Sequence, residues 1–325
     1  MPAAQLEHNK NIVRLFKECQ GRPDEAAVMR EILAPDYKRL RGGMANLAAN
    51  AQGQSFPETL HGLRGAFPDR VDVIEDIIAE GDRVGMIWRL RGTHKGNLFG
   101  IAPTGKKIDI WEIGVFRLVG GRITEGWFMA DEVGVLRQLG VNLPVRNDGK
   151  RVTPASPEQG AFAEEWVARL EQVPDSPQQH NKIVVARSKS ASPPAADRAH
   201  HVLRHWGMQH TRDYAEANGL EKFDPMSAFP DRRDHITGMI AEGDRVWMLF
   251  NLRGTHTKSF YGLPPTGRRV EMAEIGIMKF TDGRWTDSWY YADGLAMLLH
   301  LDALHFIDAL HAIPMQPPVR GSTNR

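Results

Sequence analysis

Carboxylates stand at matching places in the two halves of the chain, inside segments that alternate between apolar and polar residues. Glu112 follows Ile108 and Ile110 on the apolar parity of one segment, and Glu274 has the same place in a second segment. A buried carboxylate is costly unless it is paired or protonated, and desolvation raises its pKa toward the range that is useful for proton transfer. Two alternatives stay open: a structural salt bridge, or an outward orientation caused by a bulge.

Two histidines end a second pair of alternating segments. His94 closes the parity row that begins at Val84 and contains Trp88, and His256 closes the corresponding row that contains Phe250. Because residues of one parity share a face of a strand, both rows predict histidines at the end of an inward face. They would act as catalytic groups there, or simply be polar residues where the strand emerges into water.

The last alternating segment of each half ends in an aspartate. Three residues share one parity in each half, namely Trp127, Met129 and Asp131, and Trp289, Tyr291 and Asp293. A two-residue turn at Gly120–Gly121 would place Met129 opposite Glu112. Asp131 would then lie opposite Ile110 and diagonal to Glu112, on one face. Neighbouring carboxylates push their pKa values apart, which gives one acid and one base. Asp131 also precedes a predicted helix, so it could be only the N-cap.

These matches belong to an internal repeat of domain length. When 67–140 is aligned with 229–302, an offset of 162, the two segments are identical at 34 of 74 positions without a gap. The shared strings include FPDR, IAEGDRV, RGTH and PTG. HNK at His8 recurs at His180, an offset of 172, so the second copy is about ten residues shorter. We expect this loss in the stretch RGGMANLAANAQGQ that begins at Arg41.

Each copy combines helical and strand patterns. Apolar residues at helical spacing predict helices over 11–20 and 24–33. Alternation then predicts four strands over 72–81, 83–94, 106–119 and 122–131, and a last helix over 132–140. The EGD, PTG and GG strings indicate hairpin turns. Helices followed by an antiparallel meander are typical of an α+β domain, with a curved sheet that wraps around a conical cavity.

Turn formers and composition set the predicted domain limits. Domains are expected at 1–145 and 175–313, joined by a linker at 146–174 that contains one connector helix, with a disordered tail at 314–325. A net charge of +1 gives no electrostatic basis for binding nucleic acid or an anionic membrane. No apolar run is long enough to span a bilayer, and the N-terminal residues are too polar for a secretion signal. One cysteine, Cys19, allows neither a disulfide framework nor a Cys-based zinc site. We therefore expect a cytoplasmic protein.

The order of motifs resembles a known family. The string EGDRV…GTH.G…GI.PTGK.I…GRI.E.W…D…LRQLG is similar to the SnoaL-like polyketide cyclases of the NTF2-like superfamily, over nearly all of the first copy and most of the second. The resemblance implies tandem cone-shaped domains and an enzyme that needs no cofactor and no metal. It also implies that Asp131 and Asp293 match the family's general acid/base. Since such domains commonly dimerise, the two copies are expected to form an internal pseudo-dimer, and a further homodimer stays open.

The remaining candidates complete two predicted pockets. His210 is roughly aligned with Arg39, where a polar residue can reach the cavity in such cyclases; a solvated histidine at a helix end is the alternative. The predicted substrate-binding residues are Trp88, Trp127, Met129, His210, Phe250, Trp289 and Tyr291. The leading hypothesis is an acid/base enzyme of cyclase, lyase or isomerase type, acting on a hydrophobic small molecule with a carbonyl group. The rival hypothesis is a non-catalytic binding or scaffold protein with vestigial pockets.

Overall fold

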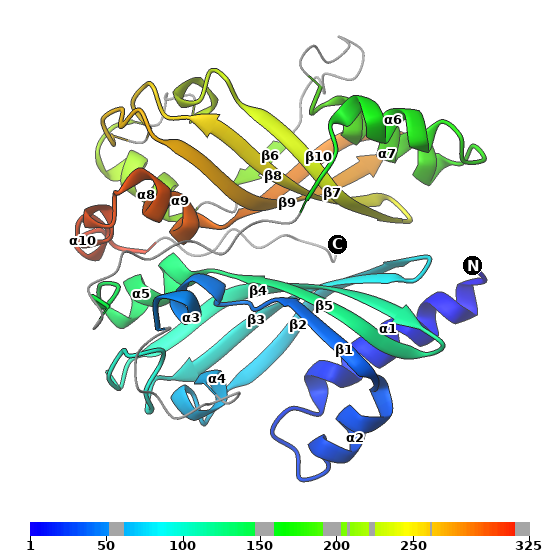
Figure 1. Ribbon diagram of the computed structural model, residues 1–325, viewed down its shortest axis with the longest axis horizontal. Coiled ribbons are helices and arrows are strands. Elements are labelled where there is room, and N and C mark those ends of the chain that lie inside the picture. The colour runs from blue at the N-terminus through cyan, green and yellow to red at the C-terminus, as the bar shows by residue number, and fades with distance from the viewer. Residues whose placement is uncertain are drawn as a thin grey trace. The chain divides into compact units, whose positions relative to one another are not determined.

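The chain consists of two α+β units, Met1–Thr153 and Pro154–Arg325 (Figure 1). The structure is a computed structural model that describes residues 1–51, 62–146, 159–190, 203–206, 209–220, 225–260 and 262–315. Within these ranges no helix is long and apolar enough to cross a membrane. Most of the predicted tail, from residue 316 onward, lies outside the described residues.

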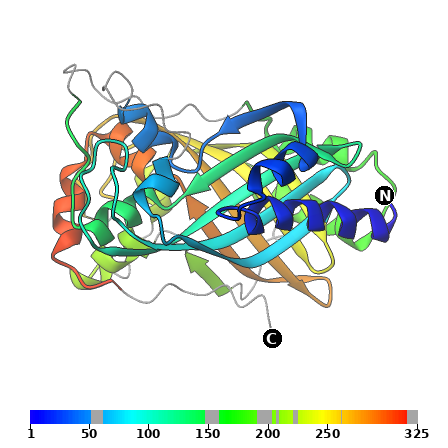
Figure 2. The ribbon, with the colours of Figure 1, turned by 90° about the horizontal axis from the view of Figure 1, so that it is seen from below.

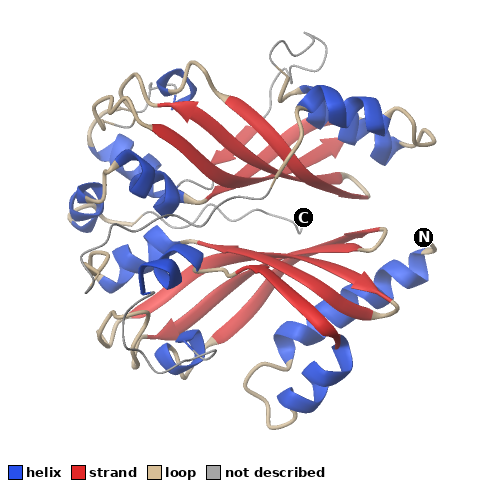
Figure 3. Cartoon of the chain, in the orientation of Figure 1, coloured by secondary structure: helices blue, strands red, loops and turns tan. Residues whose placement is uncertain are grey.

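Unit 1 is a five-stranded sheet with helices. Its helices are α1 (Ala3–Glu18), α2 (Glu25–Ile32), α3 (Ala45–Ala51), α4 (Gly62–Ala66) and α5 (Glu132–Leu139). Its strands are β1 (Leu33–Arg41), β2 (Val71–Glu80), β3 (Arg83–Thr93), β4 (Lys107–Val119) and β5 (Arg122–Ala130). The strand order is β1-β5-β4-β3-β2, and every pair is antiparallel except β1 with β5. Figure 3 shows the strands of the sheet in red and the helices in blue.

Unit 2 repeats this sheet. Its helices are α6 (Ala163–Leu170), α7 (Pro177–Arg187), α8 (Gln209–Ala217), the 3-10 helix η1 (Pro225–Ala228), α9 (Gly294–Leu301) and α10 (His305–His311). Its strands are β6 (Leu203–Trp206), β7 (Arg233–Glu242), β8 (Arg245–Thr255), β9 (Arg269–Thr281) and β10 (Arg284–Ala292). The order β6-β10-β9-β8-β7 matches that of unit 1, so the predicted tandem α+β fold is confirmed.

One long helix covers one face of each sheet. α1 packs against β2, β3 and β5 and lies across the sheet in Figure 2. Its Phe16 contacts Phe116 and Phe128, with ring centroids 5.3 and 6.1 Å apart. In unit 2 Val185 of α7 belongs to the same core cluster as Phe250. We call this side of each sheet the helix-covered face.

A bulge in β5 displaces the predicted register. Gly120 and Gly121 have φ values of 58° and 76°, as the predicted two-residue turn requires. Beyond the turn, Leu118 pairs with Ile123 but Arg117 pairs with Glu125, so Thr124 is an extra residue. Each later residue of β5 therefore points to the face opposite to the predicted one. Unit 2 has the same irregularity between Trp285 and Asp287.

β1 and β6 are strands that the sequence pattern did not predict. β1 lies at the sheet edge, contains Pro35 and is mostly exposed, so the alternation that marks a buried strand is absent. Arg41 pairs with Trp127, and His205 pairs with Trp289. Arg41 and His205 therefore correspond, at an offset of 164 in the numbering.

This correspondence corrects two expectations. Because the offset is 172 at His8 and 164 at Arg41, most of the missing residues precede Arg41, and our placement of the loss after Arg41 was wrong. At the same offset His210 corresponds to Asn46 rather than to Arg39.

The segment that we expected to be a connector helix forms α6 and packs within unit 2. Ala163 and Leu170 are buried in the core cluster of the second sheet, and the indole Nε1 of Trp166 donates to the carbonyl oxygen of Ile236 at 2.8 Å. Ala161 also forms an isolated bridge with Ile236. α6 therefore covers the edge strand β7.

Candidate active site

A buried group of four charges lies on the helix-covered face of unit 1. Nζ of Lys17, at the end of α1, is 3.0 Å from Oδ2 of Asp72 and 3.9 Å from Oε2 of Glu112. Arg70 donates to both carboxylate oxygens of Asp72 at 2.9 Å, and its Nη2 is 3.5 Å from Glu112. Nζ of Lys17 also lies 3.8 Å from the centroid of the Trp88 ring. We call Lys17, Arg70, Asp72 and Glu112 the unit 1 network.

Unit 2 contains the same network at the corresponding positions. Nζ of Lys189 is 2.8 Å from Asp234, and Arg232 donates to both oxygens of Asp234 at 2.7 and 2.8 Å. Nη2 of Arg232 is 3.4 Å from Oε2 of Glu274. Phe250 takes the place of Trp88, with Lys189 Nζ 3.6 Å from its ring centroid. Lys189, Arg232, Asp234 and Glu274 form the unit 2 network.

Burial and charge pairing shift the pKa values of these groups in opposite directions. Burial lowers the pKa of Lys17 to about 8, although Glu112 and Asp72 oppose the shift. Burial opposes ionisation of Asp234, but Lys189 and Arg232 outweigh it and bring its pKa down to about 2. Burial raises the pKa of Glu274, against the pull of Arg232. Glu274 is therefore a candidate proton acceptor, and Lys17 is a candidate proton donor.

Each network is electrically balanced, with two cations and two carboxylates. The side chains of Lys17, Asp72 and Glu112 are all less than one-tenth exposed. Taking such charges out of water is costly, and replacing a buried ion pair by apolar groups often stabilises a protein. A network that costs desolvation free energy and still occurs in both units is better explained by a function than by a contribution to stability.

Gly43, two residues after β1, lies directly against the Glu112 carboxylate. A Cβ atom at Gly43 would come within 2.0 Å of Oε1 of Glu112. Only a glycine therefore lets the chain after β1 pass this close to the network.

The aromatic residues of β5 and β10 do not share the face of the networks. Glu112 pairs with Ala130, whereas Met129 pairs with Ile113 and Trp127 with Val115. The predicted pairing of Met129 with Glu112 is therefore wrong, because the bulge at Thr124 shifts the register. The predicted place of Asp131 opposite Ile110 is wrong for the same reason, since the Asp131 backbone N–H donates to the carbonyl oxygen of Trp111 at 3.2 Å. The same holds in unit 2, where Trp289 and Tyr291 pair with Ile277 and Ile275. Aromatic residues that do share the face of the networks include Trp88 and Phe128 in unit 1, and Phe250 and Tyr290 in unit 2.

The two aspartates predicted from the family resemblance begin helices. The carboxylate of Asp131 accepts a hydrogen bond from the Gly134 backbone at 2.8 Å, as the N-cap of α5. Asp293 accepts from Ala296 at 3.1 Å, as the N-cap of α9. Asp131 is half-buried and Asp293 is buried. Capping does not occupy every lone pair of a carboxylate, so a role in proton transfer stays a prediction.

The two histidines hold the loop that follows β3 and β8. The backbone N–H of Thr104 donates to Nδ1 of His94 at 3.2 Å, and Thr266 does the same for His256 at 3.3 Å. A ring nitrogen that accepts leaves the proton on Nε2. Burial lowers the pKa of both histidines, and Nε2 of each has no partner among the described residues. They are neutral donors that the structure brings close to Phe67 and Phe229.

The neighbourhood of His210 differs between the units. In unit 1 Asn46 and Leu47 donate backbone N–H groups to Glu132 at 2.9 and 2.8 Å, which ties α3 to α5. In unit 2 His210 corresponds to Asn46, and Gly294 stands where unit 1 has Glu132. His210 is buried in α8, and unit 2 lacks the carboxylate that clamps this region in unit 1.

Sequence reasoning missed the cationic half of each network. Lys189 repeats Lys17 at the offset of 172 already seen for HNK, while Arg70 and Asp72 recur at 162. The signal that could have indicated these cations is that charged residues recur in both copies next to apolar residues, at one or the other offset. No group of three or more potential metal ligands occurs within the described ranges.

Comparison with known proteins defines the family. The profile of the SnoaL-like polyketide cyclases matches residues 11–139 and 194–301, which together make up more than half of the chain. The chain belongs to the SnoaL-like polyketide cyclase family. Among curated proteins it is similar to nogalonic acid methyl ester cyclase of Streptomyces nogalater, with 29% identity over 121 residues, 37% of this chain and 87% of that protein.

Two solved structures are similar to part of this chain. IdmH of Streptomyces antibioticus, assigned as a polyketide cyclase, is 27% identical and has a TM-score of 0.34; the match covers 41% of this chain and 99% of IdmH. A protein of Acidithiobacillus ferrooxidans with the same assignment is 28% identical at a TM-score of 0.34, covering 43% and 98%.

Proposed function

We propose that this SnoaL-like protein is a cofactor-independent acid–base enzyme of the cyclase type, acting on a hydrophobic small molecule that carries carbonyl groups. The observation that carries the proposal is the buried, charge-balanced network, which is repeated beside an aromatic ring in both units. Membership of the cyclase family supports the type of reaction.

The proposed reaction is a ring-closing aldol addition. A carboxylate removes a proton from the carbon next to a carbonyl group, and the C–H electron pair forms an enolate. The enolate carbon attacks a second carbonyl carbon, which forms a C–C bond and leaves an alkoxide. The alkoxide takes a proton back from the carboxylic acid or from a neutral donor such as His94. A cation near the enolate oxygen would lower the barrier, and Lys17 and Arg70 are suited to that role.

Asp131 and Asp293 are the proposed general bases, because they match the family's acid/base position; Glu112 and Glu274 are the next candidates. Asp131 is more exposed than Asp293. We therefore expect Asp131 to reach a substrate bound in unit 1 more readily than Asp293 reaches one in unit 2. Tyr291, a predicted substrate-binding residue, pairs with Ile275 and therefore lies on the other face of the sheet from Glu274.

The first substrate to test is nogalonic acid methyl ester, chosen from the name of the curated relative. Product formation is followed by chromatography and mass spectrometry for the full chain and for Asp131→Asn, Asp293→Asn and the double variant. Asparagine keeps the cap but cannot accept the proton, so the active unit is expected to lose roughly 10²–10⁴-fold in rate. Asp131→Ala separates the roles, since only the alanine variant should also lose about 1 kcal/mol of stability.

A binding protein is the second candidate, and one observation favours it. Lys17 and Arg70 both pair with Asp72, so neither cation is free to meet a substrate oxygen unless the network rearranges. A protein that binds the ester without turnover, and whose affinity is unaffected by Asp131→Asn, would support this second function. The pairing of the two units as an internal dimer also stays a proposal, which distance-restrained cross-linking of the full chain would test.

A further inference from the structure

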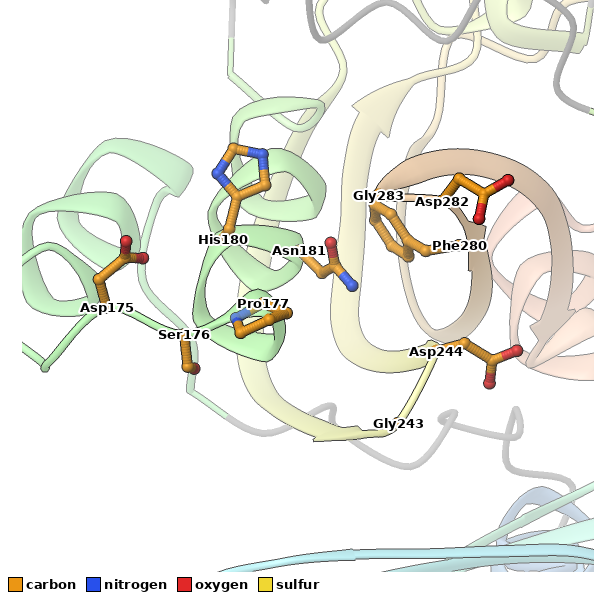
Figure 4. A pocket seen from close by; sticks show the side chains of 10 residues that line it. All are labelled: Asp175, Ser176, Pro177, His180, Asn181, Gly243, Asp244, Phe280, Asp282 and Gly283. Atoms are coloured by element: carbon orange, nitrogen blue, oxygen red, sulfur yellow. The ribbon is translucent and has the colours of Figure 1, made fainter.

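A cleft of about 630 Å³ opens in unit 2, between the start of α7 and the two hairpin turns β7–β8 and β9–β10 (Figure 4). Its aspartates do not converge on one point. Asp175 lies on the other side of α7 from Asp244 and Asp282, and the carboxylates of the latter two point away from Asn181. A better-defined surface lies at the edge of the sheet in unit 1, and the corresponding edge in unit 2 shows what such a surface binds.

In unit 2 the edge strand β7 is paired with the segment that precedes α6. Ala161 and Ile236 exchange both backbone hydrogen bonds, at 3.0 and 2.8 Å, as opposed residues of antiparallel strands do. The indole Nε1 of Trp166 donates to the same carbonyl oxygen of Ile236 at 2.8 Å. Ile236 is fully buried in this arrangement.

The side chains around this pairing show which kind of segment fits the edge. The Phe162 ring contacts both His235, with ring centroids 4.4 Å apart, and Arg233, whose guanidinium carbon is 4.5 Å from the ring centroid. A Cβ atom at Gly160 would come within 2.9 Å of the carbonyl oxygen of Ile236. The segment on β7 is therefore extended, with two small residues followed by an aromatic one.

Unit 1 has the same edge without such a segment among the described residues. β2 is the last strand of its sheet, and Ile74 pairs with Trp88 in the same register as Ile236 with Phe250. The backbone N–H and C=O of Ile74 therefore point to the outer side of β2, where no residue of the described ranges forms a bridge with it. Accordingly Ile74 is only half-buried, whereas Ile236 is buried.

The edge of unit 1 also presents apolar side chains. Val71 and Val73 hold the places of Arg233 and His235, and they are 56% and 41% exposed. Proteins normally protect an edge strand with charges or with a covering segment, because an open apolar edge pairs with other chains. Since residues alternate between faces along a strand, both valines lie on the opposite face from Asp72 and its network.

We propose that the outer edge of β2 at Val71–Ile74 binds an extended peptide segment of another protein, which adds to the sheet as an antiparallel strand. A small residue of the segment exchanges two backbone hydrogen bonds with Ile74, as Ala161 does with Ile236. The following residue is aromatic, and its ring packs on Val71 and Val73. In such strand addition the main-chain hydrogen bonds give affinity and the alternate side chains give specificity. This surface does not depend on the proposed function.

The first test needs no ligand. If the edge of β2 is open, the Ile74 amide should exchange its hydrogen at least about tenfold faster than the Ile236 amide, which donates to Ala161. Nuclear magnetic resonance of the full ¹⁵N-labelled chain compares the two amides. Equal protection of both would show that the edge is already covered, and would overturn the proposal.

The probe is a blocked peptide that copies residues 159–163, QGAFA. We expect a dissociation constant on the order of 1 mM, with a shifted resonance and slower exchange for the Ile74 amide and no change for Ile236. Two control peptides are expected to bind at least about fivefold more weakly. One is N-methylated at the residue that copies Ala161 and cannot donate to Ile74, and the other has alanine in place of Phe162 and loses the apolar contact.

Matched variants of the protein locate the contact. Val73→Lys should weaken binding of the probe about tenfold or more, because a lysine replaces the apolar surface and opposes pairing at an edge. Val119→Lys is the control, since Val119 is also exposed but lies at the end of β4, and it should leave the affinity unchanged. Both valines are exposed, so both variants are expected to fold, and their spectra verify this.

Four outcomes would each overturn the proposal. The Ile74 amide may stay unchanged at millimolar concentrations of the probe, or the Ile236 amide may respond in its place. The N-methylated peptide may bind as well as the probe, which would exclude strand pairing. Unchanged affinity in Val73→Lys would place the contact elsewhere.

Discussion

Asp234→Asn tests whether the buried network is held together by charge. The pKa of Asp234 falls from 3.8 to about 2 in the folded protein, because Lys189 and Arg232 outweigh its burial. A lowered carboxylate pKa contributes stability that is present above the unfolded pKa and is lost as the pH falls through the folded pKa. The shift corresponds to about 2 kcal/mol at neutral pH, of which about 1 kcal/mol is lost between pH 6 and pH 3. Removing one partner of a buried pair typically costs about 3–5 kcal/mol, so we expect a loss of about 2–4 kcal/mol at pH 7.

The assay must follow unit 2 by itself, because two domains need not unfold together. Urea unfolding with pulsed hydrogen exchange and mass spectrometry of β8 and β9 peptides does this, and β3 peptides of unit 1 serve as an internal control. Asp244→Asn, an exposed aspartate of the same unit, should change stability by less than about 0.5 kcal/mol. If Asp234→Asn unfolds at the same urea concentration as Asp244→Asn, or keeps the wild-type pH dependence between pH 6 and pH 3, the charge argument fails.

Three further outcomes are expected. Gly43→Ala should destabilise unit 1 by about 1–3 kcal/mol, because the new Cβ would lie 2.0 Å from Glu112. Gly42→Ala is the control, since its Cβ would have its nearest neighbour at 4.0 Å and should cost little. Thermal unfolding compares the two variants. The ¹³C resonance of Lys17 Cε should titrate near pH 8, while exposed lysines titrate near 10.4. Because Lys17 loses its proton in the folded protein before it does in the unfolded chain, unit 1 should gain stability as the pH rises from about 8 to 10.5. Thr104→Pro, which removes the N–H donor to His94 Nδ1, should speed hydrogen exchange of the 94–106 loop, and a loop unchanged in exchange would show that this bond does not hold it.

The sequence predicted the sheet better than it predicted the site. The four central strands and the turn at Gly120–Gly121 follow from alternation and glycine placement, which are local properties. The bulge at Thr124 leaves no mark in the alternation, since the residues on both parities of β5 are mostly apolar. One extra residue therefore moved Trp127 and Met129 to the other face, while Glu112 on the neighbouring strand was placed correctly against Trp88.

Hydrophobic periodicity could not reveal the partners of Glu112; only their recurrence in both copies could. Lys17 lies on a helix with a mixed pattern, and no periodicity tells that its amine enters a protein interior. Only the tertiary contact between α1 and β2 brings it to Asp72. Arg70 and Asp72 are two residues apart at the start of β2, and a pair of opposite charges so close in sequence normally indicates a surface.

The two copies differ around the networks rather than within them, and this indicates what each part does. All four charges are identical in the two units, although their sequences differ at more than half of the aligned positions. One difference touches the network itself, where Trp88 becomes Phe250. Others lie elsewhere in the unit, where Asn46 becomes His210, Glu132 becomes Gly294 and Gln5 becomes Pro177. A network needed only to fold the domain could have been replaced by apolar residues in either copy at little cost. Both units keep the network although other residues of the units differ. This fits two sites that share one arrangement of charges and bind different ligands. If so, Asp131→Asn and Asp293→Asn should affect different substrates, whereas loss of either network should disable only its own unit.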